Sequence, residues 1–172
     1  REVNYNYLEV SASGEIPLSR FGYTRWSTSA GTYLNKANLR VLEHKYFRGS
    51  DKWFFSDPSS TFQLLDKTLH TPNEFFSLNG VHHFEGAILD KIPLVNRLKL
   101  QLAGGAGILL IPDSDFAHFE AFAGLERPFR IKEQLFKISV WGVTSDSNLG
   151  EAVFTFKFGI SFFNTFTQKW DQ

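Results

Sequence analysis

The feature that most constrains the fold of this chain is residues 151–166, where apolar and polar residues alternate strictly. One face of an extended strand there carries Phe154, Phe156, Phe158, Ile160 and Phe162. Alternation with a period of two predicts a β-strand with one apolar face. Strands of soluble proteins usually have about 5–6 residues, whereas a tilted strand that crosses a bilayer needs roughly 9–11. This length and the aromatic face predict the last strand of an outer-membrane β-barrel.

Six earlier segments also have the length or the alternation of strands, namely residues 3–13, 21–34, 75–89, 98–111, 116–125 and 134–144. Two of them carry clean apolar rows, which together with the last strand predict the lipid-facing surface: Leu98, Leu100 and Leu102, then Phe136, Ile138 and Val140. The predicted fold is therefore all-β, an antiparallel up-and-down transmembrane β-barrel with about 7–8 strands in this chain. A closed bacterial barrel normally has an even number of strands, so we expect this chain to form part of a larger barrel.

The connections between the predicted strands alternate in character. Every second turn, counted from the C-terminus, carries a Pro followed by a large apolar residue, with basic residues nearby, at Pro17, Pro93 and Pro128. The other connections are polar and include a long segment, residues 35–74. Short turns at one rim and longer loops at the other are typical of transmembrane barrels. If the C-terminus is periplasmic, the long segment is an extracellular loop or folds into the lumen.

An aromatic cluster, Trp53, Phe54 and Phe55, lies within the long segment. Aromatic side chains in a loop can dock a sugar or a protein partner, or they can plug the barrel lumen. The sequence is compatible with both roles.

The composition excludes several classes of function. The formal net charge is +0, which gives no sign of a nucleic-acid partner. Cysteine is absent, so disulfides, thiolate catalysis and zinc–cysteine sites are excluded. No apolar run approaches the ~20 residues of a membrane helix. The 19 Phe, 5 Tyr and 4 Trp suit membrane-facing aromatic girdles, with an aromatic-rich soluble core as the alternative.

The sequence begins at Arg1 without a Met or a signal-peptide pattern. An outer-membrane protein needs such a signal. We therefore expect that the signal has been removed or that the sequence is a piece of a longer protein.

Two pairs of His and Glu are the candidates for chemistry. His83 and Glu85, and again His118 and Glu120, are two residues apart and so share one face of a strand. His–carboxylate pairs can bind metals or transfer protons. Barrel lumens contain many such polar pairs, however, and no nucleophile-elbow pattern accompanies these, so a structural hydrogen-bonded role is preferred. No catalytic residue, cofactor or metal site is predicted.

The middle of the chain contains recognisable motifs: Glu74-Phe75, His83-Phe84-Glu85-Gly86, Ile92-Pro93-Leu94 and Leu98-Lys99-Leu100. These motifs resemble a family of outer-membrane barrels from Bacteroidota, a domain of unknown function that follows a small carboxypeptidase-regulatory-like β-sandwich. The resemblance covers most of the chain, but only the C-terminal part of the family's architecture. It implies that residues 1–172 are the C-terminal portion of one barrel domain whose first strands and regulatory-like domain lie upstream. It implies no catalytic residues.

The favoured function is a non-enzymatic integral outer-membrane protein of a Gram-negative bacterium, acting as a scaffold, assembly factor or channel. Its expected partners are membrane lipid, the upstream strands of the same protein and other outer-membrane proteins. One alternative is an outer-membrane hydrolase with a site in the lumen or at the rim. The other is a soluble, lipocalin-like barrel, which would have an apolar interior and a polar exterior.

Overall fold

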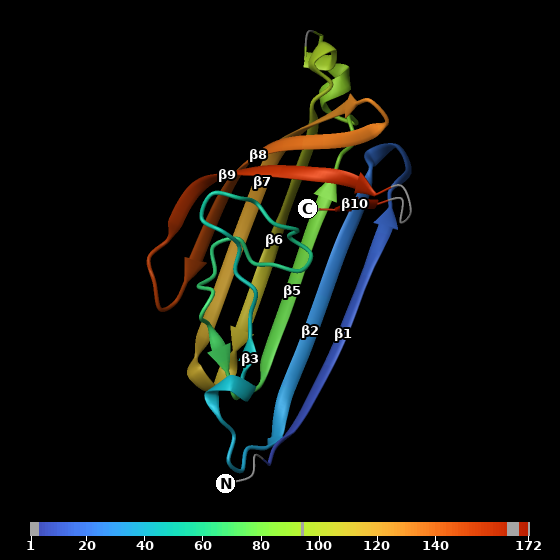
Figure 1. Ribbon diagram of the computed structural model, residues 1–172. Coiled ribbons are helices and arrows are strands. Elements are labelled where there is room, and N and C mark those ends of the chain that lie inside the picture. The colour runs from blue at the N-terminus through green and yellow to red at the C-terminus, as the bar shows by residue number, and fades with distance from the viewer. Residues whose placement is uncertain (1–3, 94, 165–168, 172) are drawn as a thin grey trace.

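The main structural element is an eight-stranded antiparallel sheet (Figure 1). Its long strands are formed by the segments in which apolar and polar residues alternate. The computed structural model describes residues 4–93, 95–164 and 169–171. The strands, in their spatial order, are β1 (Asn6–Pro17), β2 (Tyr23–Asn35), β5 (Phe75–His83), β6 (Gln101–Ile111), β7 (Phe116–Ile131), β8 (Gln134–Ser147), β9 (Val153–Asn164) and β10 (Lys169–Asp171). The prediction of an all-β, antiparallel fold is confirmed. Residues 165–166 of the predicted last strand lie outside the described residues.

The two faces of this sheet differ in polarity. On β9 the five residues of the aromatic row are between 50% and 63% exposed, while Lys157, Gly159 and Ser161 between them are buried. The register aligns this row with Val140 and Ile138 on β8. The row continues to Leu125 on β7 and Leu102 on β6. The result is an outer face that is apolar and an inner face that carries polar and charged groups.

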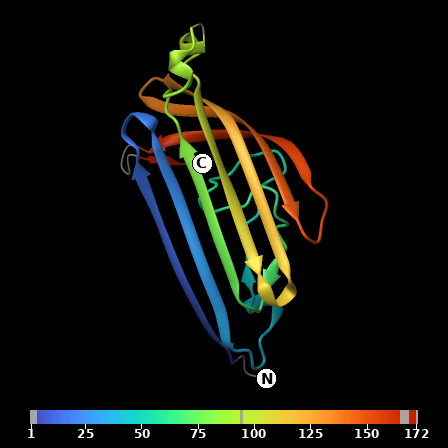
Figure 2. The ribbon, with the colours of Figure 1, turned by 180° about the vertical axis from the view of Figure 1, so that it is seen from behind.

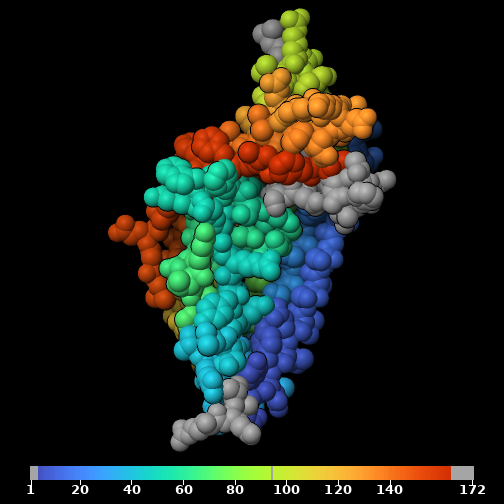
Figure 3. All heavy atoms as spheres, in the orientation of Figure 1, coloured from blue at the N-terminus to red at the C-terminus, as the bar shows by residue number. Residues whose placement is uncertain are grey.

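The inner face is covered by residues 36–74, which we call the plug (Figure 1, Figure 2). The plug contains a 3-10 helix, η2 (Val41–Glu43), and a small two-stranded sheet of β3 (Lys45–Tyr46) and β4 (His70–Thr71). Two apolar clusters join the plug to the wall. One groups Phe47, Phe62 and Leu65 with wall residues of β5 and β6, and the other centres on Phe55. Figure 3 shows the plug lying over the concave side of the sheet.

The chain between β5 and β6 differs from its prediction. The strand expected over residues 75–89 ends at His83, because Glu85 and Gly86 have positive φ angles of 44° and 86° that turn the chain away from the sheet. Residues 84–93 and 95–100 then form a projection with two 3-10 helices, η3 (Leu89–Lys91) and η4 (Val95–Leu98). The strand expected over residues 98–111 begins only at Gln101. Leu94 lies outside the described residues.

Two of the expected lipid-facing residues therefore precede the sheet. Leu98 ends η4 and is 50% exposed, and Leu100 lies just before β6, whereas Leu102 is on the strand. The leucine alternation at 98, 100 and 102 is strand-like, but the positive φ of Lys99, 53°, breaks the extended backbone between them.

The turn expected around Pro128 is also displaced. Pro128 lies within β7, opposite Lys137 of β8, and the hairpin turns at residues 132–133. Beyond Glu126 the β7 strand has β8 as its only strand neighbour among the described residues. Proline is tolerated in such an edge position because one side of the backbone needs no partner.

The ends of the strands form two rims, which we name from their positions in Figure 1. The upper rim carries the β1–β2, β5–β6 and β7–β8 connections, and the lower rim carries the β2–β3, β6–β7 and β8–β9 connections. In the described part of the chain, β1 pairs with β2 alone and so leaves one edge of the sheet without a strand partner. No helix among the described residues is long and apolar enough to span a membrane.

Candidate functional site

The first component of the candidate site is a carboxylate on the wall that holds the plug. Glu120 faces inward on β7 and is fully buried. Its two oxygens accept hydrogen bonds from the backbone N–H of Gln63 at 2.7 and 2.8 Å, and one of them also accepts from the N–H of Leu64 at 3.1 Å. A buried charge is tolerated only when such bonds compensate for its lost hydration. Glu120 therefore fixes the middle of the plug to the wall.

A buried cation on β9 complements this carboxylate. The Nζ of Lys157 donates to the carbonyl oxygens of Asp51 and Gln63, both at 2.5 Å. The side chain of Lys157 is itself fully buried. Gln63 is thus held from both directions, its N–H by Glu120 and its carbonyl by Lys157. The two wall charges bind backbone atoms, so they fix the path of the plug with little dependence on its side chains.

The acidic residue next to this contact sits at the start of a plug turn. The N–H of Trp53 donates to Oδ1 of Asp51 at 3.1 Å. This hydrogen bond, with the ammonium of Lys67 at 3.5 Å from the carboxylate, holds the pKa of Asp51 below its usual value. Asp51 therefore stays ionised through the neutral range and stabilises the turn that presents Trp53.

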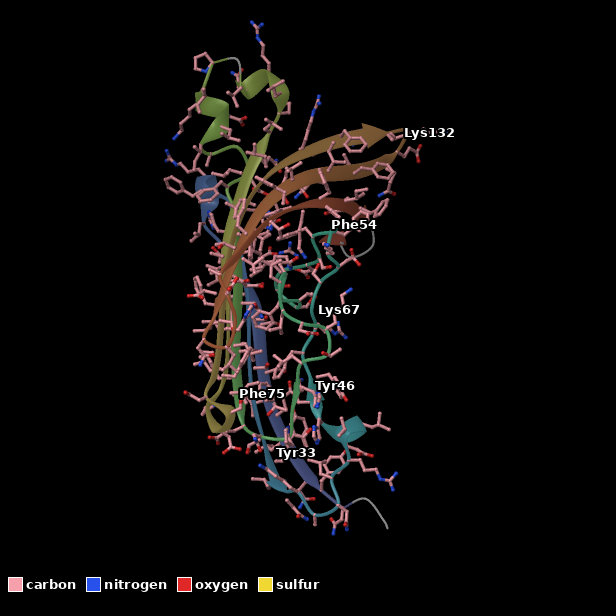
Figure 4. The ribbon with its side chains drawn as sticks, turned by 90° about the vertical axis from the view of Figure 1, so that its left-hand side faces the viewer. Tyr33, Tyr46, Phe54, Lys67, Phe75 and Lys132 are labelled. Atoms are coloured by element: carbon pink, nitrogen blue, oxygen red, sulfur yellow. The ribbon has the colours of Figure 1, made fainter. Side chains whose placement is uncertain are left out.

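The aromatic cluster of the plug is divided between two environments. Phe55 is 4% exposed and its ring stacks on Trp141 of β8, with ring centroids 4.0 Å apart and planes 4° from parallel. Trp53 and Phe54 are 61% and 57% exposed. Phe158 of β9 donates its N–H to the Trp53 carbonyl at 2.9 Å, and its carbonyl accepts from the Phe55 N–H at 2.7 Å. One aromatic residue fills the interior, and the other two remain at the surface of the plug, where Figure 4 labels Phe54.

A second charged network crosses four strands near the upper rim. Nδ1 of His83 lies 3.1 Å from Oε2 of Glu126, and the same oxygen accepts from Nζ of Lys137 at 3.1 Å. On the other side, Nη2 of Arg25 is 3.4 Å from Nε2 of His83, and the ring of Tyr23 stacks on the imidazole at 4.8 Å between centroids. His83, Glu126 and Lys137 are buried. The sequence pairs His83 with Glu85, but Glu85 lies in the turn after β5, and the structural partner of His83 is Glu126.

The second predicted pair, His118 and Glu120, lies together on the inner face of β7. Nε2 of His118 and Oε2 of Glu120 are 3.5 Å apart, and both side chains are buried on the inner face of β7. The carboxylate of Glu120 is already occupied by the plug amides, and His118 packs edge-on against Phe62 of the plug. The pair therefore belongs to the plug contact.

A polar cavity of about 810 Å³ separates the plug from β1 and β2. Hydroxyl groups form much of its lining, from Ser11, Ser13, Ser27, Ser29, Ser59, Ser60 and Ser77. Charged side chains of both signs also line it, including Arg25, Arg48 and Asp57. Across it, Nζ of Lys45 in the plug contacts Oε1 of Glu9 on β1 at 2.8 Å. The cavity can hold water or a small hydrophilic solute.

The described residues contain no group of three or more His, Asp or Glu side chains placed to hold a metal ion. The inner face offers paired charges and hydroxyls, and both ring nitrogens of His83 are engaged with Arg25 and Glu126. This arrangement orders the plug and leaves a polar cavity beside it.

Sequence reasoning did not select several of these residues as site residues, among them Gln63, Glu126 and Lys157. A signal for Lys157 was present, since a lysine in the centre of a phenylalanine-rich strand must face the polar side. The partners of Gln63 and Glu126 depend on how the plug and the strands align, which one sequence does not reveal.

Comparison with known protein families matches residues 1–125 to the C-terminal domain of a family of unknown function, DUF5686. Comparison with curated proteins gave no match, and comparison with solved structures gave none either. The matched segment extends from β1 to β7 and includes the plug and the motifs of residues 74–100. The chain therefore belongs to this family of unknown function as its C-terminal domain.

Proposed function

We propose that this chain is the C-terminal portion of an integral outer-membrane β-barrel whose lumen is occupied by the plug, and that it serves a non-enzymatic role as a scaffold, assembly factor or channel. The observation that carries the proposal is the polarity of the sheet. Its exposed face is apolar, while its covered face buries charged and polar side chains beside the two apolar clusters of the plug contact. Polar groups inside and apolar groups outside fit a barrel that meets lipid on its outer surface.

The exposed face supports lipid contact through its extent. Phe76, Leu78, Phe119, Leu125, Ile138, Val140 and the β9 row are each between 39% and 63% exposed. They form one continuous surface over β5 to β9, since the register places them side by side. Soluble monomers rarely expose apolar patches larger than a few hundred Å². A hydrocarbon environment accounts for this surface.

The covered face argues against a soluble ligand-binding barrel. Such a barrel would line its interior mainly with apolar side chains, but here the interior buries four charged side chains beside its apolar clusters: Glu120, Glu126, Lys137 and Lys157. A hydrolase site at His83 needs a nucleophile beside this histidine. Among the described residues, the hydrogen-bond partners of His83 are Arg25 and Glu126, neither of which is a nucleophile.

The free edge of β1 supports the presence of further strands. In hydrocarbon every backbone polar group must be paired, so a sheet there must close on itself. Within the described part of the chain, the twelve residues of β1 have one edge without a strand partner. We propose that upstream strands of the same protein pair with this edge and close the barrel. The family resemblance further suggests a bacterium of the Bacteroidota and a regulatory-like β-sandwich domain before the barrel.

Cell fractionation tests the proposal. The full-length protein, expressed with its own signal, is expected in the outer-membrane fraction, resistant to alkaline carbonate and released by detergent. Its band in gel electrophoresis should shift on heating, as a folded barrel unfolds. Recovery of the folded protein in the soluble periplasmic fraction without detergent would refute it. Planar-bilayer recordings of the purified protein, with and without the plug, then distinguish a channel from a scaffold.

A further inference from the structure

The upper rim carries a concentration of positive charge that the neutral composition of the chain hides. Its connections and hairpin, residues 18–22, 84–100 and 127–133, carry seven basic side chains against three acidic ones. The basic residues are Arg20, Lys91, Arg97, Lys99, Arg127, Arg130 and Lys132, and all seven are exposed. None of them forms an ion pair with another described residue.

The hairpin turns of the lower rim have the opposite charge. Residues 112–115 and 146–152 contain Asp113, Asp115, Asp146 and Glu151 and no Lys or Arg. The stretches of the plug near that rim carry both signs. The excess of exposed cations is therefore specific to the upper rim.

Apolar side chains are interspersed with these cations. Leu18, Phe21, Ile88, Ile92, Leu98 and Ile131 are between 42% and 57% exposed. Figure 1 shows their segments together at one end of the molecule, with residues 84–100 projecting beyond the strands. Figure 4 places Lys132 at the tip of the β7–β8 hairpin. A surface that is both basic and apolar suits the boundary between lipid headgroups and acyl chains.

On the outer face of the sheet, the residues of a single strand change from apolar to basic towards the upper rim. On β7 the apolar outward row that includes Phe119 and Leu125 is followed by Arg127 and then Phe129. The ring of Phe129 stacks on Phe136 at 5.5 Å, and Phe136 meets Phe162 edge-on at 5.3 Å. Aromatic groups followed by cations are typical of the level where hydrocarbon gives way to headgroups.

A tryptophan lies on the outer face of β2, close to the β1–β2 turn of the upper rim. Trp26 lies on the outer face between Gly14 and Gly80. Its indole covers Gly14, at whose position a Cβ atom would be 3.2 Å from the indole Nε1. At about 3.3 Å per residue, Trp26 is about 10 Å from the β1–β2 turn.

From these observations we propose that the upper rim binds the phosphate headgroups of anionic phospholipids in the adjacent leaflet. This inference rests on the proposed membrane location and adds a lipid preference to it. Phosphate diesters complement exposed Lys and Arg, and the neighbouring apolar side chains enter the top of the acyl region. The rim thereby fixes the depth of the barrel and its orientation.

Trp26 provides the reporter for a direct test. The full-length protein is reconstituted in phosphatidylcholine vesicles that contain either dibrominated phosphatidylcholine or dibrominated phosphatidylglycerol, whose bromines quench indole fluorescence on contact. The difference between wild type and Trp26→Phe isolates the signal of Trp26. We expect the anionic lipid to associate about fivefold more strongly for each basic residue that its headgroup contacts.

The matched variants locate the effect. Replacing Arg20, Lys91 and Arg97 together by Gln should bring the ratio of the two association constants close to one. The control Asp113→Asn, Asp146→Asn, Glu151→Gln at the lower rim should leave it unchanged. In wild type, 0.5 M NaCl should also lower the ratio of the two association constants, because salt screens exposed charge pairs. This measurement uses the wild-type protein alone, so it does not depend on whether a variant folds.

The outcomes separate the two proposals. If both lipids quench Trp26 equally in wild type, the lipid preference is refuted while the membrane location stands. A lower-rim control that loses as much preference as the upper-rim variant would also refute it. If neither lipid quenches Trp26, the membrane location itself fails.

Discussion

Phe158→Arg distinguishes lipid contact from water contact on the outer face. Phe158 is the middle of the five outward residues of β9 and is 53% exposed, so about 100 Å² of a side chain of ~200 Å² faces outward. At ~25 cal/mol per Å², removal of that surface from hydrocarbon costs about 2.5 kcal/mol. An arginine near the bilayer midplane costs about 2–4 kcal/mol more. The expected loss of unfolding free energy is therefore about 5 kcal/mol.

The assay is urea unfolding of the full-length protein in lipid vesicles, followed by tryptophan fluorescence. Asp146→Arg is the control, since Asp146 ends the outward row of β8 near the lower rim, where an arginine costs at most about 1 kcal/mol. In water a surface change such as Phe158→Arg alters stability by about 0.5 kcal/mol or less. A loss that small, or equal losses for both variants, would refute the depth-dependent reasoning.

Three further predictions concern the plug. Glu120→Gln should weaken the contact with the plug amides by about 1–3 kcal/mol, seen as faster hydrogen exchange at Gln63; unchanged exchange would contradict this. Phe55→Ala should destabilise the plug by about 3–5 kcal/mol in limited proteolysis, and the exposed Phe54→Ala by about 0.5 kcal/mol or less; equal effects would contradict the assignment of Phe55 to the interior. Burial, with His70 nearby, lowers the pKa of His44, so the unfolded plug binds its proton more readily. Plug protection should therefore fall as the pH decreases below about 6.5, and the same fall in His44→Gln would exclude His44 as its cause.

The seven long strands could be predicted because alternation is a local property. Phe154 and its row identify β9 without any knowledge of its neighbours, and the row of Phe136, Ile138 and Val140 identifies β8 in the same way. The ends of strands were predicted less well. The φ of Glu85 and the edge position of Pro128 depend on where the neighbouring strands stop, and the pattern of apolar residues contains no record of that.

Most of the candidate site could not be predicted from the sequence, because its contacts join segments that are distant in the chain. The pair His118–Glu120 was predictable because its two residues share one strand face. The partners of His83 required the register of several strands, since Glu126 is 43 residues away in sequence. The plug carries no sustained alternation, and its path is set by the buried side chains of Glu120 and Lys157. Sequence reasoning identified Trp53, Phe54 and Phe55 as one cluster, but only the position of the plug against Trp141 separates Phe55 from the other two.

The central claim is that the aromatic face of β9 meets lipid. Its most direct test is a cysteine scan of positions 153–162, because this chain contains no native Cys. Each cysteine in the reconstituted full-length protein receives a nitroxide spin label, and its collisions with oxygen and with a water-soluble nickel chelate are compared. The account predicts that accessibility to oxygen alternates with a period of two and peaks at Phe154, Phe156, Phe158, Ile160 and Phe162. High accessibility to the nickel chelate at these five positions would contradict it.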